Sequence, residues 1–419
     1  MPGGSATTPT FDPIEGTIDA FADRDPFPFY ERLRAIGSPV WDSRAKAWLV
    51  LDFEQCTQVE RDERIFANAY VFADDLTRRI KGGGANITLS RDREHDKLRR
   101  FHLKLLSPGS VSRFREAHIR PIVDFVADGL VGKTKADLFE DYAARIPPRV
   151  ICSLLGVPFD DDAMMARILE LNEEIVNFIA SGYEGEALRD RALAASQELN
   201  ETLLPYIRAR RDAPGDDFIS RVWQEAPAAG IATDEEAVLG LCRELYFAGS
   251  DTTVHGIANA LYLLLADPGR MDVIRHDRGK PLSALIEESL RLYNVVQYRH
   301  RICMEESVLG DVRIAKGAVV ILVHAAANRD PVKFACPAQI DLERRAPTDH
   351  LAFGQGSRSC VGSQLARVEM RIAIETLLDR FPDLGPDVTA DPPRFQALYM
   401  RSMAPLHVSL ERSSEKLGG

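Results

Sequence analysis

The sequence Phe-Gly-Gln-Gly-Ser-Arg-Ser-Cys-Val-Gly, residues 353–362, is the most informative stretch of this chain. It places a single cysteine, Cys360, behind two closely spaced glycines and ahead of a third. Residues 363–375 follow with helical spacing, so Cys360 is expected at the start of a helix, where backbone N–H groups point outward and the helix dipole is positive. Such surroundings favour the thiolate form of a cysteine. The glycines allow the backbone to bend tightly and to pass close to a flat or bulky group.

Two interpretations of Cys360 follow from these residues alone. A thiolate on a tight loop, with no second cysteine in a CxxC spacing nearby, suits one strong axial bond to a haem iron. The alternative is a structural cysteine buried in a glycine-rich turn.

The same ten residues resemble the haem-binding loop of the cytochrome P450 family, whose pattern is Phe-Gly-x-Gly-x-His/Arg-x-Cys-x-Gly. All six fixed positions of the pattern are filled, by Phe353, Gly354, Gly356, Arg358, Cys360 and Gly362. The resemblance implies that Cys360 is the iron ligand of haem b (iron protoporphyrin IX). It also implies that Phe353, Gly354 and Gly362 contact this cofactor.

Composition indicates a globular protein of the reduced cytoplasm. The chain has 419 residues, of which 45% are hydrophobic and 27% charged, and no apolar run is long enough to span a membrane. Its first residues lack the basic and apolar regions of an export signal. The six cysteines are scattered rather than arranged as a disulfide framework. The net charge of −11 disfavours nucleic acid as a partner.

A second motif, His95-Asp-Lys-Leu-Arg99, opens a predicted helix. His95 and Arg99 share a helix face and can present two donors to one anion, although most such pairs are solvated surface. The motif resembles the family's His-x-x-x-Arg, which holds a haem propionate. Arg301 and Arg358 are the matching donors that the resemblance implies for the other propionate.

A third motif, Ala248-Gly-Ser-Asp-Thr-Thr253, lies in the middle of a helical pattern that begins at a predicted capping box, Thr233–Glu236, and runs to residue 267. Glycine and β-branched residues are poor in a helix centre, and a threonine hydroxyl can bond a carbonyl one turn back. We therefore expect the helix to open here. The motif resembles the family's oxygen-activation segment, which implies that Asp251 relays protons and Thr252 holds dioxygen and its ordered water. The alternative is a kinked structural helix with a solvated aspartate.

A fourth motif, Glu288-Ser-Leu-Arg291, resembles the family's Glu-x-x-Arg. Arg344 is the third member that the resemblance implies. Because such a buried network fixes geometry more than it stabilises the fold, we assign it to holding the haem loop in place.

The remaining sequence predicts helices over 26–36 and 53–61, a hairpin over 40–51, and a mostly helical stretch over 110–225. Strands are predicted around 307–309, 312–314 and 319–323, and a terminal hairpin over 394–410. Residues 66–90, with Gly82-Gly83-Gly84, are predicted to form one long loop. The resemblance implies that this loop covers the substrate; the alternative is an ordinary mobile surface loop.

The substrate side of the active site is expected to include Glu244 and Ala248, which lie on the Thr252 face of the long helix. Glu244 would either pair with a cation such as Arg243 or accept a hydrogen bond from a polar group of the substrate. Apolar walls are expected from Val295 and Val296, and Met400 would reach back toward the substrate.

These expectations define a mainly α fold with small β sheets, the cytochrome P450 fold. They place one domain at 25–411 between a flexible lead-in, 1–24, and a C-terminal tail, 412–419. The implied activity is that of a haem-thiolate monooxygenase, which inserts one oxygen atom of O2 into a small organic substrate, for example an aromatic one, by hydroxylation or oxidative demethylation.

The electrons are expected from a separate ferredoxin and its reductase, because the chain lacks a nucleotide-binding glycine motif and has no room for a fused reductase. This partner would dock near Arg99, Arg100 and Arg113, unless these arginines are ordinary solvated surface. We expect a monomer that binds neither nucleic acid nor a membrane. The rival functions are a peroxide-driven peroxygenase, a haem isomerase or reductase, and a non-enzymatic haem sensor. The Asp251–Thr252 pair argues against the first two, and a sensor would have no use for this pair or for a loop that covers the substrate.

Overall fold

The computed structural model describes residues 25–180, 185–396 and 400–411. The expected lead-in (1–24) and tail (412–419) lie outside these residues. The chain divides into two compact units. The first comprises residues 1–69, 258–360 and 391–405, and the second comprises residues 70–257, 361–390 and 406–419. In the described residues no helix has both the length and the apolar character needed to cross a membrane.

The first unit is built on a five-stranded sheet of order β1-β2-β8-β5-β3, in which only β2 and β8 run parallel. Its strands are β1 (Val40–Asp42), β2 (Ala47–Val50), β3 (Phe66–Asn68), β5 (Arg299–Cys303) and β8 (Val319–Leu322). Two hairpins accompany this sheet, β6 (Ser307–Leu309) with β7 (Val312–Ile314) and β10 (Arg394–Gln396) with β11 (Ser402–Ala404). The helices are α1 (Phe27–Ile36), α2 (Phe53–Arg61), α13 (Pro268–His276), α14 (Lys280–Leu292) and α15 (His324–Ala327).

Strand β2 organises the core of the first unit because alternate side chains point to opposite faces of the sheet. Ala47 and Leu49 belong to a cluster with Phe27 and Tyr30 of α1. Trp48 and Val50 belong to a second cluster with Phe53 and Val59 of α2. The sheet is thus covered on both faces, by α1 and by α2.

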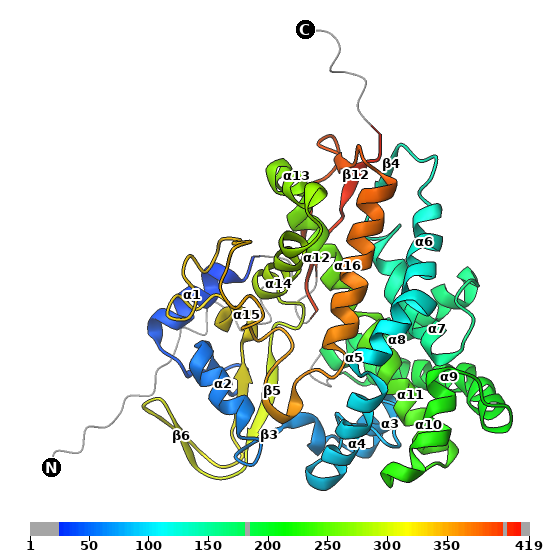
Figure 1. The fold of residues 1–419 in the computed structure, drawn as a ribbon. Helices are drawn as coiled ribbons and strands as arrows, with labels where there is room; N and C mark the ends of the chain where they lie inside the picture. The colour runs from blue at the N-terminus through cyan, green and yellow to red at the C-terminus, as the bar shows by residue number, and fades with distance from the viewer. Residues whose placement is uncertain (1–24, 181–184, 397–399, 412–419) are drawn as a thin grey trace. The chain divides into compact units, whose positions relative to one another are not determined.

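The second unit is mostly helical. Its helices are α3 (Asp75–Ile80), α4 (Asp92–Leu105), α5 (Pro108–Phe114), α6 (Arg120–Asp128), α7 (Ile146–Leu155), α8 (Asp162–Ala180), α9 (Glu186–Asp212), α10 (Phe218–Glu225), α11 (Glu235–Ser250) and α16 (Ser363–Arg380). Helix α11 packs against α7, α9 and α10 (Figure 1). A small sheet of order β4-β12-β9 joins β4 (Lys135–Asp137), β12 (His407–Ser409) and β9 (Gly385–Pro386). Helix α12 (Thr252–Leu265) contains the boundary between the two units.

Most predicted elements are confirmed, and three details are corrected. Residues 66–90 are not one long loop, since they contain β3, a 3₁₀ turn at Ala69–Phe72 and α3. The cap of α11 is Asp234 rather than Thr233, because the Asp234 carboxylate accepts the N–H of Ala237 at 2.8 Å. The tail beyond β11 does not extend the predicted hairpin, because β12 pairs with β4 and β9.

Candidate active site

The loop that carries Cys360 is closed by its own backbone. The N–H of Cys360 donates to the carbonyl of Phe353 at 2.8 Å, and the N–H of Gly354 donates to Leu351 at 2.9 Å. A single 3₁₀ turn, η7 (Gly356–Arg358), lies between them. The Cys360 thiol is exposed and forms no disulfide. The structure thus presents a thiol on a short, internally bonded loop.

Two glycines of the loop are required by its contact with the end of α2. Gly354 and Gly356 have φ of 65° and 68°, a region that side chains rarely adopt. A Cβ atom on Gly356 would lie 2.5 Å from the backbone oxygen of Glu60. The N–H of Gln355, between them, donates to the Glu60 carboxylate. The loop therefore rests directly on the last turn of α2.

Glu60 is a buried carboxylate beside a histidine and two arginines. Its Oε1 lies 3.2 Å from Nε2 of His324 and 3.5 Å from Nη2 of Arg301. Burial opposes its ionisation, but His324, Arg299 and Arg301 outweigh burial and lower the pKa of Glu60 to about 2. Sequence reasoning missed Glu60 and His324, because neither residue stands in a motif.

The arginines expected to bind a propionate occupy the same region of the first unit. Arg301 is buried beside Glu60, and Nε of Arg358 donates to Glu63 at 2.6 Å. Arg299 adds a third guanidinium, whose buried Nε has no hydrogen bond in the described part of the chain. Three arginines here face two glutamates, so positive charge is in excess. A cofactor that carries carboxylates fits this donor set.

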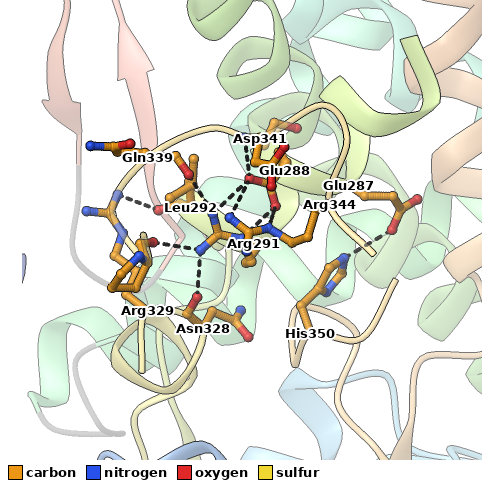
Figure 2. A network of polar contacts seen from close by, with 12 residues as sticks. Glu287, Glu288, Arg291, Leu292, Asn328, Arg329, Gln339, Asp341, Arg344 and His350 are labelled. Carbon is orange, nitrogen blue, oxygen red and sulfur yellow. Dashed lines mark hydrogen bonds and ion pairs between the residues drawn. The ribbon is translucent and has the colours of Figure 1, made fainter. Parts of the chain in front are cut away.

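The Glu288 network forms as predicted (Figure 2). Nε and Nη2 of Arg291 donate to the two Glu288 oxygens at 2.7 and 2.8 Å, and Nε of Arg344 donates to Oε1 at 2.9 Å. Arg291 also donates to the carbonyls of Asn328, Pro337 and Gln339. The side chain of Asn328 in turn accepts the N–H of Leu351 at 2.7 Å. The network therefore ties α14 to the irregular chain that leads into the Cys360 loop.

The segment Ala248–Thr253 interrupts the long helix, as predicted. Helix α11 ends at Ser250 and α12 begins at Thr252, with Asp251 between them. The hydroxyl of Thr252 donates to the carbonyl of Ala248 at 2.8 Å. This bond engages a carbonyl at the end of α11, which explains why the helix opens here. Asp251 Oδ1 lies 3.5 Å from Nε2 of His255, one turn further along.

One stripe of this segment remains accessible. Ala248 is exposed, and Phe247, Asp251 and Thr252 are partly exposed, whereas residues 241–246 are buried. The small, solvent-accessible side chain of Ala248 leaves room for a ligand beside the helix opening.

Glu244 does not pair with Arg243 and is bonded to residues 87 and 88 instead. Its carboxylate accepts the N–H of Ile87 at 2.6 Å, the N–H of Thr88 at 3.1 Å and the Thr88 hydroxyl at 2.5 Å. The expectation that Arg243 would pair with it is wrong, because Arg243 donates to Ser196, Asn200 and Ile80. Backbone N–H groups thus take the place of the expected cation.

The other predicted site residues are placed as follows. His95 is buried on α4, with Nδ1 3.3 Å from Asp96, and Arg99 is partly buried one turn later. In the first unit Val296 and Met400 form a β-bridge, and the carbonyl of the adjacent Val295 accepts the N–H of Arg401. The part of the predicted tail at residues 398 and 399 lies outside the described residues.

Helix α16 carries a buried carboxyl that sequence reasoning missed. Glu369 is buried, and its Oε2 has no hydrogen bond in the residues that the structure describes. Burial raises the pKa of Glu369 well above its ordinary value. Its signal in the sequence is a charged residue on a predominantly apolar helix face.

The family model for cytochrome P450 matches residues 40–404. Cytochrome P450 monooxygenase PikC of Streptomyces venezuelae is 31% identical over 396 residues, which cover 92% of this chain and 91% of the relative. Cytochrome P450 107B1 of Saccharopolyspora erythraea is 31% identical over 408 residues, covering 93% and 96%. The crystal structure of P450BioI in complex with acyl carrier protein ligated by hexadec-9Z-enoic acid has a TM-score of 0.83 at 26% identity, covering 92% and 99%.

The chain therefore belongs to the cytochrome P450 family. It is a monooxygenase, and hence an oxidoreductase, and its cofactor is haem b. The resemblance that the four sequence motifs carry, and the mainly α fold with small sheets that it implied, are confirmed.

Proposed function

We propose that this protein inserts one oxygen atom of O2 into a small organic substrate, with Cys360 as the haem ligand and electrons from a separate ferredoxin and its reductase. The observation that supports the proposal most strongly is the interrupted helix, where Asp251 and the Thr252 hydroxyl lie next to the exposed Ala248. An acid and a hydroxyl at a helix opening are the groups that a proton-dependent cleavage of dioxygen needs.

We propose the residues that hold the cofactor from their charge and their position in the structure. Arg301 and Arg358, with excess positive charge around them, are suited to one propionate, and His95 and Arg99 on α4 are proposed for the other. The loop that carries Cys360 includes Phe353, Gly354 and Gly362, which are proposed to contact the haem. Glu288, Arg291 and Arg344 hold this loop by fixing the chain that precedes it. When bound, a haem with a thiolate ligand supplies the electron density that favours O–O cleavage.

Proton movement is the chemistry that we assign to this chain's own side chains. In the proposal, Asp251 receives protons from the solvent side, and the 3.5 Å contact with His255 orients its carboxylate. Thr252 holds a water molecule with its oxygen, because its hydrogen is donated to Ala248. Removing either group would interrupt the path by which this chain delivers protons to the place where a bound haem would activate dioxygen.

The substrate side of the site is proposed to include the accessible Ala248, with Val295, Val296 and Met400 as apolar walls. Glu244 is assigned to fixing residues 87 and 88, because protein donors already engage both of its oxygens.

The expected cytoplasmic location and monomeric state belong to this proposal. All six cysteines are free, including the exposed Cys336 and Cys360, as suits a reducing compartment.

Product formation tests the proposal. With NADH, a ferredoxin and its reductase, a substrate that shifts the haem spin state is expected to be oxygenated. Product with peroxide alone, and none with the electron-transfer partners, would identify a peroxygenase instead. Haem binding without any product in either system would favour a sensor. A ferredoxin that docks near the exposed Arg100 and Arg113 should lose affinity when both are replaced by glutamine.

A further inference from the structure

Lys81 has an ammonium group that the protein positions but does not pair. Its Nζ lies 4.3 Å from the ring centroid of Tyr70 and 5.2 Å from that of Phe247, and the side chain is partly buried. Within the described parts of the chain this ammonium makes no hydrogen bond or ion pair. Aromatic faces attract a cation, but they leave the three N–H donors of a lysine unused. The group is therefore available to an acceptor from outside the protein.

The backbone around Lys81 is fixed against α11. The three following residues, Gly82, Gly83 and Gly84, have φ of 98°, 56° and 52°. A Cβ atom on Gly240 of α11 would lie 2.9 Å from the carbonyl oxygen of Gly83, so this segment lies directly on the helix. On the other side of Lys81, the carbonyl of Ile80 accepts a hydrogen bond from Arg243 at 3.2 Å. The ammonium is thus held in place before any ligand arrives, which lowers the entropic cost of binding.

The charged and titratable groups near Lys81 include Glu244, Arg243 and Tyr70. Glu236 of α11 lies near the same segment, since its Oε1 would be 3.6 Å from a Cβ atom on Gly83. Glu244 attracts the ammonium, but its carboxylate is bonded to Ile87 and Thr88. Arg243 points toward Ser196 and Asn200. Burial lowers the pKa of Lys81 to about 8, with Glu244 acting against this shift. Most molecules therefore carry the charged ammonium at pH 7, and no acidic side chain among the described residues neutralises it by direct contact.

We propose that Lys81 binds a carboxylate of the substrate. The proposal rests on the proposed oxygenase function and names its substrate class. Phe247 is five residues before Thr252, about 7.5 Å along the helix axis. A substrate whose acid group reaches Lys81 would be oxidised on the order of 10 Å away from that group. Medium-chain fatty acids and arylalkanoic acids have this length and an apolar body to lie along the accessible Ala248.

The test compares acids with their methyl esters on the haem-loaded enzyme. Octanoic, decanoic and 4-phenylbutanoic acid and their methyl esters are titrated, and dissociation constants are measured by haem spin-state shift and by calorimetry. In the unmodified enzyme the acids should bind at least about tenfold more tightly than the esters, as expected for a charge-assisted bond. Lys81→Met should abolish the preference, whereas Lys81→Arg should retain it. Lys316→Met, at an exposed lysine of the other unit, is the matched control and should change nothing.

The pH dependence gives a second readout. Because the pKa of Lys81 is about 8, acid affinity should fall about tenfold between pH 7 and pH 9, while ester affinity stays constant. The proposal is overturned if no acid binds more tightly than its ester, or if Lys81→Met keeps the preference. Failure of the oxygenase function is recognised separately, by the absence of a thiolate-type spectrum in the reduced carbon monoxide complex.

Discussion

Asp251 and His255 form a contact of 3.5 Å between Oδ1 and Nε2 across the first turn of α12. The contact directs the carboxylate of Asp251 along the helix, while the neighbouring Thr252 hydroxyl bonds Ala248 in the preceding turn. An acid and an alcohol are thus oriented independently at one break in the helix.

Replacing Asp251 by asparagine removes the acid but keeps the shape of the side chain. Because a positioned acid contributes about 10²–10⁴-fold to a proton-transfer step, turnover should fall by at least about 10²-fold. Substrate affinity and the haem spectrum should not change. Asp272→Asn, at an exposed aspartate of α13, is the control. Unchanged turnover in the Asp251 variant, measured as product per enzyme per minute, would exclude a role in proton delivery.

Thr252→Ala removes the hydroxyl and its bond to Ala248. Without the hydroxyl, the water that carries the proton loses its position, so reducing equivalents should be diverted to hydrogen peroxide. The measurement is the ratio of product to NADH consumed, with peroxide assayed in parallel. Thr253→Ala, next along the chain at a buried position, is the matched control. A normal ratio for Thr252→Ala would remove Thr252 from the mechanism.

Glu60 makes the fold sensitive to acid. The pKa of Glu60 is lowered to about 2 in the folded protein, so its contribution to stability is complete above the unfolded value of about 4.5 and is lost as the pH falls toward 2. A shift of this size corresponds to about 3 kcal/mol. Glu60→Gln should lower the free energy of unfolding by about that amount at pH 7, and the difference from the unmodified protein should shrink between pH 4.5 and pH 2.

The control for Glu60 is Glu305→Gln, which breaks an exposed ion pair with Arg64. Exposed pairs contribute little, so the unfolding curve of this variant should match that of the unmodified protein. Chemical unfolding monitored at several pH values measures both variants. A difference between Glu60→Gln and the unmodified protein that stays constant from pH 7 to pH 2 would show that the stabilisation does not depend on the charge of Glu60.

The sequence predicted the helices, the hairpins and the Glu288 network because each depends on spacing within one or two short segments. The contacts of Glu60 and Lys81 were not predicted, because their partners are set by tertiary packing between segments more than 150 residues apart. For Lys81 these partners are Glu244 and Phe247, and for Glu60 they are His324 and Gln355. The α11 cap was misassigned because Thr233 and Asp234 are both capable of capping.

The interpretation of residues 66–90 failed for a related reason. Glycine runs are typical of mobile loops, but Gly83 and Gly84 provide room for a helix backbone. A Cβ atom on Gly84 would collide with the carbonyl of Glu236 on α11. Only the structure reveals which surface a glycine run lies against.

Gly356→Ala tests the contact between the Cys360 loop and α2. The added Cβ would lie 2.5 Å from the Glu60 carbonyl oxygen at a φ of 68°. A strained φ alone costs about 1–3 kcal/mol, so we expect the free energy of unfolding to fall by more than this and haem occupancy to decrease. Gly317→Ala is the matched control, because Gly317 has a φ of 83° but no atom within 4 Å of the added Cβ. Denaturant unfolding and haem content are measured for both variants. A larger loss of stability in Gly356→Ala than in Gly317→Ala measures the contribution of the contact with Glu60. Equal losses in the two variants would show that this contact contributes nothing.

The most direct test of the account is the absorption spectrum of the reduced carbon monoxide complex after Cys360→Ser. Cys336→Ser, which removes the other exposed cysteine, is the control and should retain the thiolate-type band. The account predicts that Cys360→Ser loses this band while the protein remains folded. A thiolate-type band that survives in Cys360→Ser would contradict the assignment of Cys360 as the haem ligand.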